Sequence, residues 1–234
     1  MTTWHASAPA GIAARFLQVR QRTLELCASL SAEDLQLQSM PDASPGKWHL
    51  AHTSWFFEQF VLGHDPAYRP RDPAWHYLFN SYYQSVGPMH ARPQRGLLSR
   101  PSLDEVRDYR RYIDEAVGEL LNRADDAELP GLVELGLQHE QQHQELLLTD
   151  IKHAFWCNPL QPAYRAPIAA SADAKAVPLR FVDGREGIVE IGHRGEGFAF
   201  DNETPRHRTL LQPHALANRL VTNAEYLAFV REGG

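Results

Sequence analysis

The sequence has few cysteines, no long apolar run and no excess of positive charge. Its two cysteines, Cys27 and Cys157, are far apart and match no zinc-binding or redox spacing. A disulfide framework is therefore not expected, and a reducing compartment, the cytoplasm, is the predicted location. No apolar stretch approaches the roughly 20 residues that span a bilayer. Residues 1–11 lack the basic flank and apolar centre of a secretion signal.

The charge balance excludes a further class of partners. The formal net charge is −6 with histidine neutral, which argues against nucleic acid or an anionic membrane surface as a partner. The 234 residues, 43% of them hydrophobic, are enough for one large or two small domains with a buried core. Histidine is abundant, with 12 residues, and its arrangement guides the functional analysis.

A His-Glu-Gln-Gln-His motif at residues 139–143 lies within one predicted helix, residues 132–155. His139 and His143 are four residues apart, so they lie one above the other on a helix face. Apolar residues at three- and four-residue steps are expected to turn that face toward a core: Leu132, Leu135, Leu146, Ile151 and Phe155. Two inward imidazoles one turn apart can hold one cation, and a third ligand must come from elsewhere.

Three further helices are predicted before this one, and four helices with one long crossover indicate a bundle. Their expected bounds are residues 9–31, 45–62 and 102–122. Ser44 is the expected N-cap of the second helix, with Pro45 in its first turn. Ser102 and Glu105 form a capping box at the start of the third. Residues 63–100 show no period and are expected to form a long connection of the kind that often carries function.

The pattern changes beyond the bundle. Residues 158–178 are rich in proline and alanine and are expected to be a linker. Residues 181–192 predict a β-hairpin, and residues 197–205 a further strand and turn. Thr222 and Glu225 form the capping box of a short C-terminal helix. So few strands indicate the start of a domain rather than a whole one.

The third metal ligand is expected from a helix that faces the fourth one. The second helix offers His49 and His52, and their spacing alone leaves the choice open. Three neutral imidazoles would leave coordination positions free, which is typical of a catalytic site. The aromatic residues Trp55, Phe56 and Phe57 are expected to belong to the bundle core.

The same motif also fits the zinc-peptidase pattern His-Glu-x-x-His, in which the glutamate is the general base. Residues 144–151 lack the glycine and the third histidine of the metzincins, and they are bundle-like. The peptidase alternative is therefore disfavoured. Glu140 and Glu145 are expected to be solvated charges on the helix face.

Five segments together resemble the ergothioneine-biosynthesis sulfoxide synthases, usually called EgtB. They are residues 44–58, 79–87, 92–101, 139–146 and 197–207. The resemblance implies an α+β chain that begins with a DinB-type four-helix bundle over residues 1–157. A linker over residues 158–178 would follow. Residues 179–234 would then begin an incomplete domain similar to formylglycine-generating enzyme, with an α/β C-type-lectin-like fold.

The resemblance also implies a cofactor and a reaction. The family holds non-haem Fe(II) with three histidines, which map to His52, His139 and His143. It joins the sulfur of γ-glutamylcysteine or cysteine to C2 of the hercynine imidazole, uses O₂ and leaves a sulfoxide. The residues alone do not choose between the two thiols or between iron and zinc.

The resemblance further implies three substrate contacts. Arg92 and Arg95 resemble the pair that clamps the carboxylates of the sulfur donor, and Gln142 is expected to touch hercynine or a bridging water. Family members continue beyond the position of Gly234 and supply a proton-donating tyrosine there. The chain is therefore expected to be a fragment or a truncated product that binds iron with little turnover. The alternatives are a non-catalytic metal-binding scaffold and another DinB-type enzyme, such as a metal-dependent thiol transferase.

Overall fold

The computed structural model describes residues 11–83, 85–123, 128–166, 177–195 and 197–234. The chain divides into two compact units, residues 1–167 and 168–234. Much of the predicted linker lies outside the described residues. The domain boundaries expected at residues 157 and 179 therefore stay a proposal.

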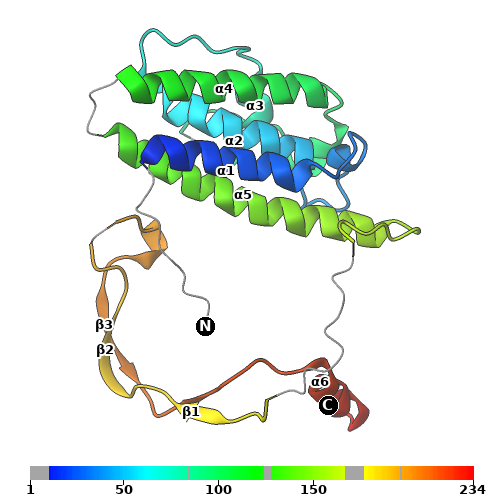
Figure 1. Ribbon diagram of the computed structural model, residues 1–234, viewed down its shortest axis with the longest axis vertical. Helices are drawn as coiled ribbons and strands as arrows, with labels where there is room; N and C mark the ends of the chain where they lie inside the picture. Colours follow the sequence, from blue (N-terminus) through cyan, green and yellow to red (C-terminus); the bar gives the residue numbers. More distant parts are fainter. Residues whose placement is uncertain (1–10, 84, 124–127, 167–176, 196) are drawn as a thin grey trace. The chain divides into compact units, whose positions relative to one another are not determined.

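The first unit is a bundle of four long helices that lie side by side (Figure 1). These helices are α1 (Ile12–Cys27), α2 (Gly46–Phe60), α4 (Leu103–Arg123) and α5 (Leu129–Cys157). The apolar periods located all four of them. The main differences are that α1 ends before the predicted residue 31 and that α5 begins before the predicted residue 132.

The core of the bundle is built on the aromatic face of α2. Trp55, Phe56 and Phe57 are buried, as predicted. The ring of Phe57 lies so close to Gly136 of α5 that a Cβ atom there would meet it at 2.5 Å. Only glycine permits this approach. Gly136 precedes His139 by about one turn, so this contact brings the histidine face of α5 close to α2.

The buried face of α5 agrees with the predicted one in part, because Ile151 and Phe155 are buried as predicted. Leu135 and Leu146 were predicted to face the core, but they are 40% and 39% exposed. Val133, Leu137 and Leu147 are buried in their place.

The long connection between α2 and α4 carries three short helical elements. It contains η2 (Leu62–His64), α3 (Trp75–Phe79) and η3 (Arg92–Leu97), and a separate turn, η1 (Asp34–Gln36), precedes α2. The helix α3 packs against α2 and buries Trp75 and Phe79. The turn η3 carries Arg92 and Arg95, the two arginines expected at the substrate site.

One of the two predicted caps of the bundle is confirmed. The Glu105 N–H donates to Ser102 Oγ at 3.3 Å, and the Ser102 N–H donates to Glu105 Oε2 at 2.7 Å. The prediction for Ser44 is wrong, because Pro45 occupies the N-cap position of α2 without a side-chain bond. The Ser44 hydroxyl is engaged elsewhere, since it accepts a hydrogen bond from Arg95 Nη1 at 2.9 Å.

The second unit contains two antiparallel strand pairs and a short helix (Figure 1). Its elements are β1 (Phe181–Asp183), β2 (Gly187–Ile191), η4 (Asp201–Glu203), β3 (His207–Leu211), β4 (Ala215–Ala217) and α6 (Asn223–Arg231). The strand β1 pairs with β4, and β2 pairs with β3. The predicted hairpin over residues 181–192 is therefore wrong. The Gly184 N–H donates to the His214 carbonyl at 2.8 Å and extends the β1–β4 pairing instead of closing a turn.

Of the other two predictions for the second unit, one is confirmed and one is only partly correct. Within residues 197–205, predicted as a strand and turn, residues 201–203 form the 3-10 turn η4, and none of the residues is in a strand. The capping box of Thr222 and Glu225 opens α6, as predicted. The chain thus has the predicted α+β organisation, a helical bundle followed by short antiparallel strands. Among the described residues, no helix combines the length and the apolar composition that a membrane crossing requires.

Candidate metal centre

Three histidines from two helices converge inside the bundle. His52 lies on α2, His139 and His143 lie on α5, and one candidate ligand atom from each is within 4.8 Å of the others. Two nitrogens on one cation at ~2.1 Å lie at most ~4.2 Å apart. Small ring rotations would therefore bring the set into ligand range, so the donor set fits a single transition-metal ion.

The hydrogen bonding of His52 fixes which of its nitrogens is free. Its Nδ1 lies 2.6 Å from the Phe79 carbonyl, which can only accept, so Nδ1 carries the proton. The lone pair is then on Nε2, which lies 3.3 Å from Nε2 of His139. Trp48 stacks on the His52 ring at 4.4 Å, and Phe56 stacks on the His139 ring at 4.1 Å. These contacts hold both rings edge-on to the space between them.

Burial keeps the imidazoles neutral. His52 and His139 are 1% and 9% exposed. Desolvation holds the pKa of His52 well below its ordinary value and lowers the pKa of His139 to about 4. Desolvation, and then the neighbouring histidines, also lower the pKa of His143. Neutral imidazole is the form that binds a metal ion, so the site needs no deprotonation near neutral pH.

His49, the competing candidate for the third ligand, lies beside the cluster rather than in it. Its Nδ1 is 2.9 Å from Nδ1 of His143, and its Nε2 is 3.0 Å from Oδ2 of Asp150. Both ring nitrogens are therefore engaged. His49 touches a proposed ligand instead of offering a free nitrogen to the cation.

The histidines lie in the wall of a cavity of about 440 Å³. The cavity brings together all six residues expected to bind metal or substrate. Its lining is Ser44, Trp48, His49, His52, Ser81, Tyr82, Tyr83, Arg92, Arg95, His139, Gln142, His143 and Leu146. Because Leu146 lines this open space, it is exposed despite its apolar side chain.

Arg95 is a buried cation without an ion-pair partner among the described residues. It is 2% exposed, and no carboxylate in the described part of the chain forms an ion pair with it. Its guanidinium lies 3.4 Å over the ring of Trp48 and donates to the hydroxyls of Ser44 and Ser81. Desolvation, and then Arg92, lower the pKa of Arg95 to about 10, so it stays charged near neutral pH. A buried, unpaired guanidinium favours an anionic ligand in this cavity.

Arg92 lies at the rim of the same cavity and is half-buried. It donates to the Tyr82 hydroxyl at 2.9 Å and to the Asp42 carbonyl. Its buried Nε, like that of Arg95, has no hydrogen-bond partner among the described residues. Gln142 also lines the cavity, one residue before His143. The structure thus gathers Arg92, Arg95 and Gln142 beside the histidines, and their substrate contacts stay a proposal.

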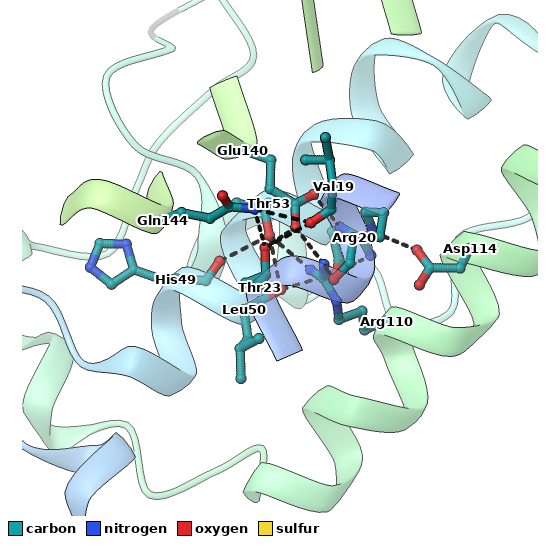
Figure 2. A network of polar contacts seen from close by, with 11 residues as sticks. Val19, Arg20, Thr23, His49, Leu50, Thr53, Arg110, Asp114, Glu140 and Gln144 are labelled. Atoms are coloured by element: carbon teal, nitrogen blue, oxygen red, sulfur yellow. Dashed lines mark hydrogen bonds and ion pairs between the residues drawn. The ribbon is translucent and has the colours of Figure 1, made fainter. Parts of the chain in front are cut away.

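Glu140 is not the solvated charge that the sequence predicted. Its side chain is fully buried between α1 and α4 (Figure 2). Oε2 accepts from Arg20 Nη1 at 3.0 Å, and Oε1 accepts from Thr23 at 2.5 Å and from Arg110. Burial alone would raise the pKa of Glu140, but Arg110 and Arg20 outweigh it and lower this pKa. Glu145, in contrast, is exposed as predicted.

The same network reaches the backbone of the histidine-bearing helix α2. Arg110 donates to the Thr53 hydroxyl at 3.1 Å, and Thr53 donates to the His49 carbonyl at 3.1 Å. Figure 2 shows these bonds converging on one cluster, with Asp114 paired to the far side of Arg20. The network therefore ties the His139 turn of α5 to the His49 turn of α2.

Sequence reasoning missed Arg20 and Arg110, although a signal was present. Arg20 follows Phe16 by four residues, and Arg110 follows Val106 by four, so each arginine occupies the apolar stripe of its helix. A charged residue on a core stripe is seldom buried unless it is paired. Two such arginines predict a buried carboxylate, which is Glu140.

The position of Glu140 also bears on the peptidase alternative. A general base must reach the water that it activates. Both oxygens of Glu140 are occupied by buried donors from α1 and α4. The glutamate of the His-Glu-x-x-His pattern is a structural ion in this chain, and the peptidase mechanism lacks its base.

A four-helix bundle with three converging neutral histidines in a cavity wall has the donor set that a metal-binding helical bundle requires. Comparison with known proteins identifies the superfamily of this bundle. Residues 15–147, more than half of the chain, match the DinB superfamily, so the chain belongs to this superfamily.

The chain is also similar to two proteins named hercynine oxygenase. The protein from Mycolicibacterium thermoresistibile is 30% identical over 233 residues, which cover 96% of this chain and 49% of that protein. The protein from Mycolicibacterium smegmatis is 26% identical over 217 residues, 92% of this chain and 49% of that protein. The chain thus spans about half the length of these relatives.

Proposed function

We propose that this chain carries the metal and thiol sites of a hercynine oxygenase of ergothioneine biosynthesis. The observation that carries the proposal is the juxtaposition, in one cavity, of three neutral histidines and the unpaired guanidinium of Arg95. A metal ion and a carboxylate-bearing thiol are the ligands that such a cavity suits. The names of the two relatives supply the reaction class.

The proposed reaction joins hercynine to γ-glutamylcysteine or cysteine. The C2–H and S–H bonds are lost, a C–S bond and an S–O bond form, and the second oxygen atom of O₂ leaves as water. Fe(II), when bound, would supply the redox chemistry with O₂ and draw the thiol in as thiolate. The substrates are small molecules, and the cytoplasm stays the predicted location.

The residues of this chain have separate roles in the proposal. His52, His139 and His143 hold the iron through neutral nitrogens. Arg95, with Arg92 at the rim, binds the carboxylates of the thiol and fixes the direction from which its sulfur approaches.

Gln142 lies beside His143 and faces the same cavity. Its amide can both donate and accept hydrogen bonds, so it suits the carboxylate or imidazole of hercynine. Because the chain spans about half of its relatives, further hercynine contacts are expected outside it.

The experiment has two stages. First, the chain is loaded anaerobically with Co(II) as a spectroscopic substitute, and each thiol is added; we expect a thiolate-to-cobalt charge-transfer band. Second, the Fe(II)-loaded chain receives hercynine, each thiol and O₂, and products are detected by mass. We expect the sulfoxide conjugate, in low yield.

His143→Ala is the matched control for both stages, since it removes one proposed ligand and should abolish band and product. A chain that binds metal but shows neither a thiolate band nor a conjugate would support the scaffold alternative. A conjugate formed with Zn(II) but not with Fe(II) would exclude the oxygenase reaction.

A further inference from the structure

We propose that His49 and Asp150 form a hydrogen-bonded relay that holds His143 in the tautomer whose Nε2 is free to bind a cation. Both would be positioning residues, because they act through His143. The inference deepens the proposed function and rests on the three-histidine site. It is carried by two distances: His49 Nε2 to Asp150 Oδ2 is 3.0 Å, and His49 Nδ1 to His143 Nδ1 is 2.9 Å.

The order of donors and acceptors along the relay follows from its anchored end. An ionised carboxylate has no proton to give. Oδ2 of Asp150 already accepts the Ser44 N–H at 2.9 Å. The ring nitrogen of His49 that meets Oδ2 must therefore be a donor, so Nε2 of His49 carries a proton.

The remaining steps follow one from another. A neutral imidazole has a single N–H, so Nδ1 of His49 is an acceptor. The nitrogen that faces it, Nδ1 of His143, must then be the donor. The lone pair of His143 is left on Nε2, the nitrogen that the relay does not use.

The opposite arrangement would put protons on both nitrogens of His49. That would make His49 a buried cation. Desolvation lowers the pKa of His49, the Asp150 carboxylate opposes this shift, and Arg95 and Arg92 lower the pKa further. Nδ1 of His143 would then have to accept a hydrogen bond. The single proton of neutral His143 would lie on Nε2 and block that nitrogen from binding a cation. The neutral relay avoids both the repulsion and the blocked ligand.

The relay provides an acceptor for the Nδ1 proton of His143, as a backbone carbonyl does for that of His52. The Phe79 carbonyl fixes Nδ1 of His52 as a donor, and the relay fixes Nδ1 of His143 in the same way. Asp150 follows His143 by seven residues, about two helical turns, so both lie on one face of α5. His49 reaches across from α2 and bridges them, which links the ring orientation to the packing of two helices. Such partners typically change metal affinity by about 10–100-fold.

The test reads the tautomers directly, without iron, substrate or turnover. Protein labelled with ¹⁵N-histidine is examined near neutral pH by long-range proton–nitrogen correlation, metal-free and with Zn(II). The variants His49→Gln and His143→Gln assign the signals. We expect His49 protonated at Nε2 and His143 protonated at Nδ1 in the metal-free protein. A His143 protonated at Nε2, or a doubly protonated His49, would overturn the proposal.

Two substitutions test the consequence for the cation. Asp150→Ala removes the anchor at a partly exposed position, and we expect mixed tautomers of His143 and a 10–100-fold loss of Zn(II) affinity. Glu145→Ala, which removes an exposed charge from the same helix, is the control. It should change neither the tautomer of His143 nor the affinity for Zn(II). Equal behaviour of the two variants would contradict the relay. The wild-type tautomers decide the matter if Asp150→Ala does not fold.

A conservative variant separates positioning from packing. The amide oxygen of His49→Gln can still accept from Nδ1 of His143, whereas His49→Phe fills the space without an acceptor. We expect His49→Gln to retain Zn(II) affinity closer to the wild type than His49→Phe does. The reverse order would count against the relay. Because no readout involves O₂ or hercynine, failure of the oxygenase proposal would leave these results interpretable.

Discussion

Arg20 of α1 lies 3.0 Å from the carboxylate of Glu140 on α5, and both side chains are almost completely buried. The pair joins helices whose residues are far apart in sequence, and it sits one residue after the proposed ligand His139. A buried charge that loses its partner is costly, whereas a solvated one is not. The stability of the bundle should therefore depend on Glu140 far more than on other acidic residues of α5.

Replacing Glu140 by Gln keeps the shape of the side chain and removes its charge. Arg20 and Arg110 then keep their buried charges with one fewer countercharge, so we expect a loss of about 3–5 kcal/mol in the free energy of unfolding. Urea denaturation of the metal-free protein measures it. Glu145→Gln on the exposed face should stay within about 0.5 kcal/mol of the wild type. Equal effects of the two substitutions would show that the network in Figure 2 adds little stability.

Local sequence rules predicted the helices but could not predict this network, because its contacts join different helices. The apolar periods found α1, α2, α4 and α5, and the capping boxes at Ser102 and Thr222 marked two helix starts correctly. Glu140 was misjudged because its partners, Arg20 and Arg110, come from other helices. A side chain that is polar on its own helix is buried only when another helix supplies the countercharge.

The errors in the second unit and at Ser44 have the same origin. The strands β1 and β2 were expected to pair with each other across a short turn, but their partners, β4 and β3, come later in the chain. Ser44 resembles an N-cap locally, but its hydroxyl is used by Arg95. In the site, the spacing of His139 and His143 was readable from the sequence, whereas the choice between His49 and His52 needed the family resemblance. Only the three-dimensional arrangement shows Asp150 beside His49.

The ligand set predicts which histidines matter for metal uptake. His143→Ala and His52→Ala each leave two imidazoles, too few to hold the ion firmly, so stoichiometric uptake of Zn(II) or of anaerobic Fe(II) should be lost. Equilibrium dialysis with metal analysis measures the stoichiometry. His153→Ala is the control, because His153 lies on the same helix but contacts Ser39 and Cys157. Uptake that survives in His143→Ala would mean that the ligand set is wrong.

The unpaired charge of Arg95 predicts opposite effects on binding and on stability. In Arg95→Met the carboxylate of the thiol loses charged hydrogen bonds worth about 1.5–3 kcal/mol, so thiol affinity should fall by about 10–100-fold. The thiolate band of the Co(II)-loaded chain measures this affinity. The free energy of unfolding should hold or rise, because a buried charge without a carboxylate partner has been removed.

Two variants sharpen this test. Arg95→Lys keeps the charge but loses the planar group that lies over Trp48 and reaches two hydroxyls, so it should restore only part of the affinity. Arg100→Met removes an exposed charge and should leave the affinity unchanged. Thiol binding that is equally weak in Arg95→Met and Arg100→Met would mean that net charge, not the Arg95 site, attracts the thiol.

The two cysteines should differ sharply in reactivity. Cys27 is 2% exposed, and desolvation raises the pKa of its thiol to about 11. At about pH 8 its thiolate is therefore on the order of one part in a thousand, and the rate of alkylation should rise with pH until about 11.

Cys157, at the end of α5, is exposed. Mass analysis after brief alkylation of the native protein should find one modified cysteine, Cys157, and two after denaturation. Cys157→Ser should abolish the native modification. Alkylation of Cys27 in that variant at the rate of a denatured thiol would show that α1 opens readily and that the bundle is looser than its buried contacts imply.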